Sequence, residues 1–156
     1  MDTKFEDIVS EIKKTVNLFP YNIAIIEDGI PTLYYSQMWE DATCIANRLK
    51  EQCDSSEYVT VELPKSSRYI CAILGCWMAG KAFVPIGKDL PDSRKRYIEE
   101  TVDTNLSITE YNYDDFFKSQ PIDSVETLTA STPAYVIFSS GTTGKPKGIL
   151  VGHSGL

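Results

Sequence analysis

Positive charge is scarce in this chain of 156 residues, which has 15 lysines and arginines against 22 aspartates and glutamates. The formal net charge of -7 argues against nucleic acid and anionic membrane surfaces as partners, because both attract proteins with a basic face. Long apolar runs are also lacking, and no stretch approaches the ~20 residues that a membrane-spanning helix needs. The N-terminus, Met1 to Asp7, has no basic region leading into an apolar one, so we predict no secretory signal.

Cysteine and histidine are few as well, with four cysteines and one histidine. The cysteines at positions 44, 53, 71 and 76 do not have the spacing of a metal site, so we predict no metal ligands in this chain. We interpret them as buried free thiols in a reducing compartment. The protein is therefore expected to be cytoplasmic.

The hydrophobic fraction of 42% and the charged fraction of 24% are ordinary for a globular domain, and the length suffices for one core. Four segments have apolar residues at helical spacing: 5–16, 36–49, 64–79 and 92–102. The predicted helix caps are Asp2 or Thr3, Ser36, and Asp92 or Ser93. The residues expected to face the core are Met38, Ala42, Ile45 and Leu49 in the second helix and Tyr97, Ile98, Thr101 and Val102 in the fourth. The third segment is apolar almost all round, which indicates a buried helix.

Strand patterns occur between these helices, at 23–26, 32–35, 59–63, 82–86 and 106–109. Asp28-Gly29 joins the first two as a hairpin turn. The run 82–86 is apolar throughout, which suits the interior of a parallel or mixed sheet. Residues 111–132 are polar and acidic, and we interpret them as a solvated connection. This order of elements predicts an α/β fold, with a layered mixed or parallel sheet flanked by helices.

The most informative stretch is the glycine-rich loop from Ser139 to Gly148, SSGTTGKPKG, which lies between the apolar runs 134–138 and 149–151. Glycines allow backbone N–H groups to turn toward an anion, while hydroxyl groups and lysines add donors and charge. We interpret the loop as a cradle for nucleotide phosphate. The predicted ligand-binding residues are Ser139, Ser140, Gly141, Thr142, Thr143, Gly144 and Lys147. An ordinary Gly/Ser/Thr hairpin loop is the alternative.

The loop differs from the Walker A motif G-x-x-x-x-G-K-[ST]. Pro146 follows Gly144-Lys145 where that motif requires a hydroxyl group, and Gly141 lies too close to Gly144. A Walker A loop also opens into a helix, whereas Pro146 and Gly148 disfavour one and a strand-like run follows. The sequence therefore predicts strand, loop and strand. A P-loop NTPase remains as an alternative that predicts magnesium-dependent hydrolysis sensitive to Lys145→Ala.

The loop resembles the signature phosphate loop of the adenylate-forming enzymes, which include acyl-CoA synthetases, luciferases and adenylation domains of non-ribosomal peptide synthetases. Three further stretches are similar to segments of that family. They are LYYSQM at 33–38 (family "LTYxEL"), MAGKAFVPI at 78–86 ("KAGxAYVPL") and VGHSGL at 151–156 ("VxHxxL"). The short path from Pro85 to Ser139 favours the peptide-synthetase type. D-alanine–carrier-protein ligases share this feature, acyl-CoA ligases share Phe138 to Gly141, and Gly87 stands where peptide-synthetase domains commonly have aspartate.

The resemblance implies a reaction in which a carboxylic or amino acid and ATP, with Mg2+, form an acyl-adenylate and pyrophosphate. A carrier-protein thiol or another thiol then takes the acyl group. The resemblance also implies that Thr142, Thr143 and Lys147 contact the β- and γ-phosphates, while Ser139 and Ser140 support the loop. Lys145 is expected to be solvated.

His153 lies at the start of a helix in the family, so packing or capping is favoured for it over acid–base chemistry. The family's magnesium-binding glutamate, ribose-binding aspartate, acid-selecting residues and mobile lysine all lie in later parts. Residues 1–156 therefore resemble the N-terminal part of an adenylation domain that is truncated just after the loop, with a natural start at Met1. We expect no complete catalytic set, no activity of the chain alone, and self-association through apolar surface that the missing part would cover. A stand-alone nucleotide- or anion-binding or interaction module is the alternative.

Overall fold

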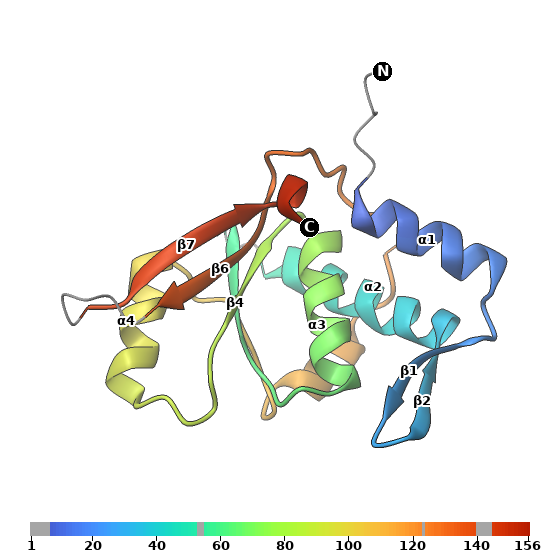
Figure 1. Cartoon of the computed structure of the whole chain (residues 1–156), viewed down its shortest axis with the longest axis horizontal. Coiled ribbons are helices and arrows are strands. Elements are labelled where there is room, and N and C mark those ends of the chain that lie inside the picture. The colour runs from blue at the N-terminus through green and yellow to red at the C-terminus, as the bar shows by residue number, and fades with distance from the viewer. Residues whose placement is uncertain (1–6, 53–54, 123, 140–144) are drawn as a thin grey trace.

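Five strands form one sheet in the part of the chain that the structure, a computed structural model, describes: residues 7–52, 55–122, 124–139 and 145–156. The strands lie in the order β5–β3–β4–β6–β7 (Figure 1). Their bounds are β3 Tyr58–Glu62, β4 Ala82–Pro85, β5 Ser107–Thr109, β6 Pro133–Ser139 and β7 Lys147–Gly152. β5, β3, β4 and β6 run parallel, and β7 returns antiparallel to β6. The predicted α/β fold with a mixed sheet is confirmed.

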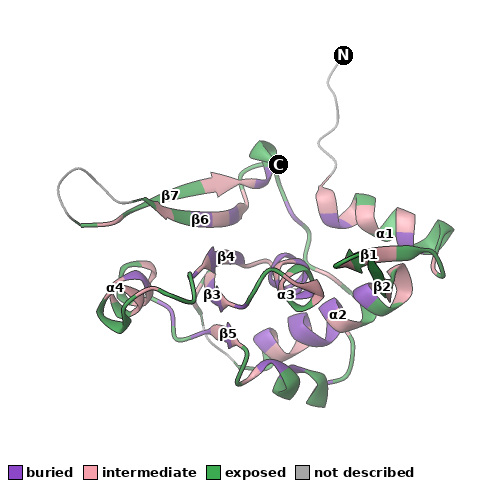
Figure 2. Cartoon of the chain, turned by 60° about the horizontal axis from the view of Figure 1, so that its bottom comes forward, coloured by how far each residue is buried: buried purple, intermediate pink, exposed green. Residues whose placement is uncertain are grey.

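Helices cover both faces of the sheet (Figure 2). α1 (Ile8–Leu18), α2 (Tyr35–Glu51) and α3 (Ser67–Met78) lie on one side, and α4 (Asp92–Val102) lies on the other. The main core joins α2 and α3 to the sheet, and a smaller cluster of Val84, Ile86, Ile98 and Val136 lies beneath α4. The apolar strand at 82–86 is thus covered on both faces: Val84 and Ile86 are buried on the α4 side, and Phe83 is partly buried against the main core. None of the helices within the described residues has the length and apolar character needed to cross a bilayer.

The hairpin predicted around Asp28-Gly29 is present as β1 (Ile23–Glu27) and β2 (Ile30–Tyr34). Asp28 and Gly29 both have positive φ, at 50° and 80°. A two-residue turn of this kind matches the twist of the two strands and favours Asp-Gly. The hairpin forms its own two-stranded sheet beside α2 (Figure 1).

The predicted helix caps were wrong in position. α1 is capped by Asp7, whose carboxylate accepts from the Ser10 N–H at 3.0 Å; the predicted caps Asp2 and Thr3 lie outside the described residues. α2 begins directly after β2, so Ser36 lies inside the helix and the Gln37 side chain accepts from the Tyr34 N–H at 3.1 Å. In α4, Pro91 precedes the first helical residue, so Asp92 and Ser93 already lie in the first turn, where an acidic side chain suits the helix dipole.

The predicted core positions of α2 are confirmed, since Met38, Ala42, Ile45 and Leu49 are all buried. In α4, Ile98 is buried and Tyr97 and Val102 are half-buried, but Thr101 is exposed. The Thr101 hydroxyl instead donates to the Tyr97 carbonyl at 2.6 Å, one turn earlier. A threonine hydroxyl satisfied within its own helix does not need to face the core.

The solvated connection predicted for residues 111–132 was wrong in part. A short 3-10 helix, η1 (Tyr113–Lys118), buries Tyr113 and Phe116 against the main core. The Asn112 side chain holds the preceding turn, accepting from the Thr109 N–H at 2.7 Å and donating to the Ser107 carbonyl at 2.9 Å. The acidic composition of residues 111–132 had suggested a solvated loop and gave no sign that these two aromatic side chains would be buried.

α3 packs closely against α2 at Gly75. A Cβ atom at this position would lie 2.6 Å from Cγ2 of Ile45 and 3.0 Å from the carbonyl oxygen of Ala42. These distances are shorter than carbon atoms tolerate, so glycine is required for the two helices to pack. α3 is the buried helix that its apolar sequence predicted, with Cys71, Leu74 and Met78 among its buried residues.

The cysteine prediction is confirmed for the described residues, since Cys44, Cys71 and Cys76 are free and buried, while Cys53 lies outside the described residues. Burial raises the pKa of both Cys71 and Cys76 to about 12. Thiols with such a high pKa remain protonated and unreactive at neutral pH. These cysteines are therefore packing residues.

Candidate functional site

The β6–β7 hairpin carries the glycine-rich loop, which confirms the predicted order of strand, loop and strand. Its register pairs Ile137 with Ile149, Phe138 with Gly148 and Ser139 with Lys147. Residues Lys147–Gly152 form a strand, whereas a Walker A loop is followed by a helix. The chain therefore does not have the Walker A arrangement at this position. β6 is joined to the parallel sheet through the pairing of Phe83 with Tyr135. The described ends of the loop, Ser139 and Lys147, therefore lie at the carboxyl edge of the parallel strands, where open α/β sheets bind ligands.

Two of the predicted site residues, Ser139 and Lys147, lie opposite each other at the base of the loop. Both are exposed, as is Lys145. The other predicted residues, Ser140, Gly141, Thr142, Thr143 and Gly144, lie outside the described residues. The structure thus brings a hydroxyl-bearing residue and a lysine together at the mouth of the hairpin, with both accessible to solvent.

Close packing within the hairpin explains why position 148 is a glycine. A Cβ atom here would lie 3.1 Å from Cζ of Phe138 and 3.1 Å from Cγ1 of Val136. The missing side chain lets the Phe138 ring lie close to β7, one register position before the Ser139–Lys147 pair. The last glycine of the loop motif therefore shapes the hairpin.

Sequence reasoning missed one contact at this site. The hydroxyl group of Tyr97, on α4, donates to the carbonyl oxygen of Pro146 at 3.3 Å. Helical spacing placed Tyr97 among the inward-facing residues of α4, but nothing in the sequence indicated that its hydroxyl group reaches the loop. A contact between residues 49 positions apart can be seen only in the folded chain.

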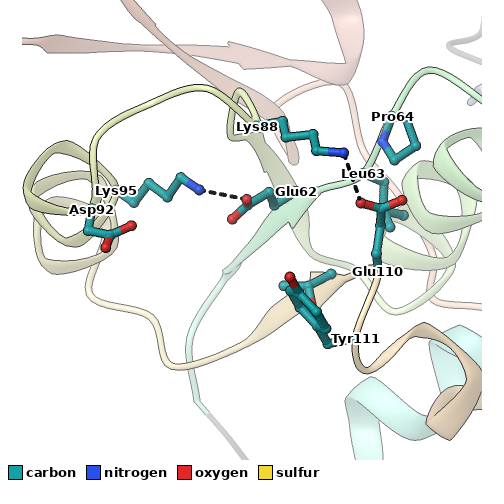
Figure 3. A pocket seen from close by; sticks show the side chains of 9 residues that line it. Glu62, Leu63, Pro64, Lys88, Asp92, Lys95, Glu110 and Tyr111 are labelled. Atoms are coloured by element: carbon teal, nitrogen blue, oxygen red, sulfur yellow. Dashed lines mark hydrogen bonds and ion pairs between the residues drawn. The ribbon is translucent and has the colours of Figure 1, made fainter.

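A second hollow lies at the carboxyl ends of β3 and β5, with a cavity volume of about 430 Å³ (Figure 3). Its charged and aromatic lining residues are Glu62, Lys88, Asp92, Lys95, Glu110 and Tyr111. The Lys95 ammonium lies 2.6 Å from the Glu62 carboxylate, and the Lys88 ammonium lies 3.6 Å from the Glu110 carboxylate. Each lysine is thus paired with an acid, and Asp92 adds a further negative charge. This hollow suits phosphate less well than the loop does.

His153 follows β7 and begins a short 3-10 helix, η2 (His153–Gly155). The residue is 4% exposed, and its ring meets the Trp77 ring edge-on at 5.4 Å between centroids. Neither ring nitrogen has a hydrogen-bond partner among the described residues. Burial lowers the pKa of His153, and the Asp7 carboxylate opposes this shift. The expectation that this histidine packs at a helix start is confirmed.

The lowered pKa of His153 predicts a pH-dependent stability. The unfolded chain binds a proton on this ring at a higher pH than the folded chain does, so acid favours unfolding. The free energy of unfolding is expected to be fully retained above about pH 6.5 and to fall as the pH drops toward the lower folded-state pKa. Urea unfolding at about pH 7.5 and pH 5.5 measures this change. His153→Phe should remove this part of the pH dependence, and an unchanged dependence in that variant would contradict the assignment.

Comparisons with known proteins agree on one family. A family model described as "AMP-binding enzyme" matches residues 12–156. The dapdiamide synthesis protein DdaD of Enterobacter agglomerans is 29% identical over 150 residues, covering 94% of this chain and 26% of that protein. Surfactin synthase subunit 3 of Bacillus subtilis is 30% identical over 163 residues, covering 92% of this chain and 13% of that protein. The chain therefore corresponds to a small part of these relatives.

Solved structures share the fold. The NpsA N-terminal subdomain of Klebsiella oxytoca, in complex with anthranilyl-AMSN, aligns with a TM-score of 0.85 and 20% identity, covering 97% of this chain and 42% of that chain. An artificially fused adenylation–PCP di-domain, NpsA-ThdA from the same organism, aligns with a TM-score of 0.85 and 19% identity, covering 99% and 34%. At these identities the likeness concerns the fold alone.

Proposed function

Since the chain belongs to the family of AMP-binding enzymes, we propose that residues 1–156 form the N-terminal part of an adenylation domain of the peptide-synthetase type. The whole domain would activate an amino acid or another carboxylic acid as its acyl-adenylate. The observation that supports this best is the hairpin at the carboxyl edge of the sheet, which presents Lys147 beside Ser139. Acyl-CoA ligases and D-alanine–carrier-protein ligases are the alternatives within the same chemistry.

In the proposed reaction a carboxylate oxygen of the acid attacks the α-phosphorus of ATP. The new oxygen–phosphorus bond forms as the bond to the bridging oxygen breaks, and pyrophosphate leaves. A thiol then attacks the acyl carbon, and AMP leaves as the second product. Residues 1–156 would form no covalent bond with the substrates. They would contribute positioning and charge stabilisation, which dominate catalysis of displacement at phosphorus.

This segment would hold the β- and γ-phosphates. Lys147 supplies the positive charge, and Thr142 and Thr143 supply hydroxyl donors, while Ser139 and Ser140 support the loop. The glycines at 141 and 144 would let the backbone approach the phosphates. The site fits an anion because Lys147 is exposed at the mouth of the hairpin, away from the paired lysines of the second hollow. Mg2+ would enter with ATP and neutralise phosphate charge.

The proposed partners follow from this chemistry. The acid and ATP are the substrates, and a carrier-protein thiol takes the acyl group in the cytoplasm. The remainder of the adenylation domain would complete the site. Ile149 and Leu150 of β7 are 55% and 53% exposed, and we propose that this apolar edge either contacts that remainder or mediates self-association.

ATP–pyrophosphate exchange tests the proposed function. The full product of the gene is expected to catalyse exchange with one or more amino or aryl acids, whereas residues 1–156 alone are expected to bind pyrophosphate without catalysing exchange. Calorimetric titration of the 156-residue chain with pyrophosphate measures the binding directly. A folded full-length product that supports no exchange with any acid would refute the adenylation proposal. Binding without exchange in that product would favour an anion-binding module.

A further inference from the structure

We propose that Tyr97 is a positioning residue for the phosphate-binding loop, an inference that rests on the proposed function. Its hydroxyl group would fix the carbonyl group of Pro146 and thereby orient Lys147 toward phosphate. Tyr97 is half-buried on α4, and its hydroxyl group lies 3.3 Å from the Pro146 oxygen. This hydrogen bond joins α4, on one face of the sheet, to the end of the loop just before β7.

The helix that carries Tyr97 is anchored on both sides of this residue. Ile98, the next residue, is buried in the cluster with Val136 of β6 and Val84 of β4. Lys95 forms its 2.6 Å ion pair with Glu62 at the end of β3. α4 is thus tied to the strand that enters the loop and to the centre of the sheet. A hydroxyl group on such a support can hold a loop atom in a defined place.

Pro146 transmits this constraint to Lys147. The peptide unit between them is planar, so fixing the Pro146 carbonyl also sets the direction of the Lys147 N–H and Cα. The proline ring restricts its own φ as well. On the far side, the pairing of Lys147 with Ser139 in the hairpin register fixes the same residue from β6. Lys147 is therefore held between a side-chain contact and a strand contact.

Tyr97→Phe tests the proposal because it removes the hydroxyl group and keeps the ring. The dissociation constant for pyrophosphate is expected to rise about fivefold in the 156-residue chain, the effect of one net hydrogen bond. In the full-length product the KM for ATP should rise by a similar factor, whereas the KM for the acid should stay unchanged. The melting temperature of the 156-residue chain should fall by no more than about 4 °C, the effect of losing one hydrogen bond. Tyr111→Phe is the matched control, since the Tyr111 side chain is 100% exposed, and it should behave like the wild type.

A double-mutant cycle separates positioning from a general structural role. If Tyr97 acts through Lys147, then Tyr97→Phe should have no further effect on pyrophosphate binding in a Lys147→Met background. Additive effects would overturn the proposal, as would equal rises in the KM for ATP and the KM for the acid. A wild-type chain that neither binds pyrophosphate nor supports exchange would overturn the proposed function and this assignment together. Wild-type activity with an unchanged Tyr97→Phe variant would overturn this assignment alone.

Discussion

Replacing Lys147 with alanine is expected to lower ATP–pyrophosphate exchange by the full-length product about 100-fold, the usual cost of removing one preorganised donor from a site of developing charge. Lys147 lies at the mouth of the β6–β7 hairpin and is exposed, so its charge is available to phosphate. The chain as a whole has a formal net charge of -7, which repels phosphate at long range. Local charge at the loop must therefore provide the attraction.

Lys145→Ala is the matched control, because this lysine is exposed on the same limb of the loop. It is expected to change exchange by less than about threefold, as solvated surface charges usually do. Pyrophosphate titration of the 156-residue chain should rank the variants in the same order. Equal losses for the two lysines would show that total charge, and not the position of Lys147, governs the site.

Gly75→Ala is expected to destabilise the fold by about 2 kcal/mol, the usual range for overpacking a dense core. The added methyl group would meet Ile45 at 2.6 Å and the Ala42 carbonyl at 3.0 Å. Alanine favours helices over glycine by up to about 1 kcal/mol, so the overlap must outweigh that gain. Gly75→Leu should cause a larger loss. Urea unfolding measures the effect as a lower midpoint with an unchanged slope.

Gly87→Ala provides the comparison for Gly75. A Cβ atom at position 87 would lie 3.6 Å from Cγ of Leu90, an ordinary contact distance. This variant should therefore stay within about 0.5 kcal/mol of the wild type. Ile45→Ala removes one of the clashing atoms, so its cost should be smaller in the Gly75→Ala background than in the wild type. Strict additivity would show that the α2–α3 contact is not the cause.

The features that could be predicted from the sequence were those set by local pattern. Apolar spacing gave the buried face of α2, because a helix in contact with a core repeats its contacts every three to four residues. The Asp28-Gly29 pair gave the hairpin turn, since both residues adopt positive φ. Pro146 gave the strand after the loop by disfavouring a helix there. Motif resemblance then gave the family, which the comparison over residues 12–156 confirmed.

The features that could not be predicted depend on contacts between distant residues. Tyr113 and Phe116 lie in an acidic segment whose composition resembles a loop, and only the neighbouring core explains their burial. The start of α2 was predicted at Ser36, but β2 runs directly into the helix and Gln37 completes the cap. The Tyr97–Pro146 contact belongs to the same group, because it depends on how α4 lies against β6.

The connectivity of β6 has a consequence for folding kinetics. β6 and β7 are separated by the loop alone, whereas β6 meets β4 only after the chain has passed through α4, β5 and η1. Hairpins close within about 1–10 μs, and the entropic cost of closure grows with the length of chain enclosed. The two limbs of the loop can therefore meet transiently before the parallel sheet is complete. The Ser139–Lys147 pairing at the base of the loop therefore belongs to the contacts that can form early in folding. The Tyr97–Pro146 hydrogen bond needs α4 in place and forms later.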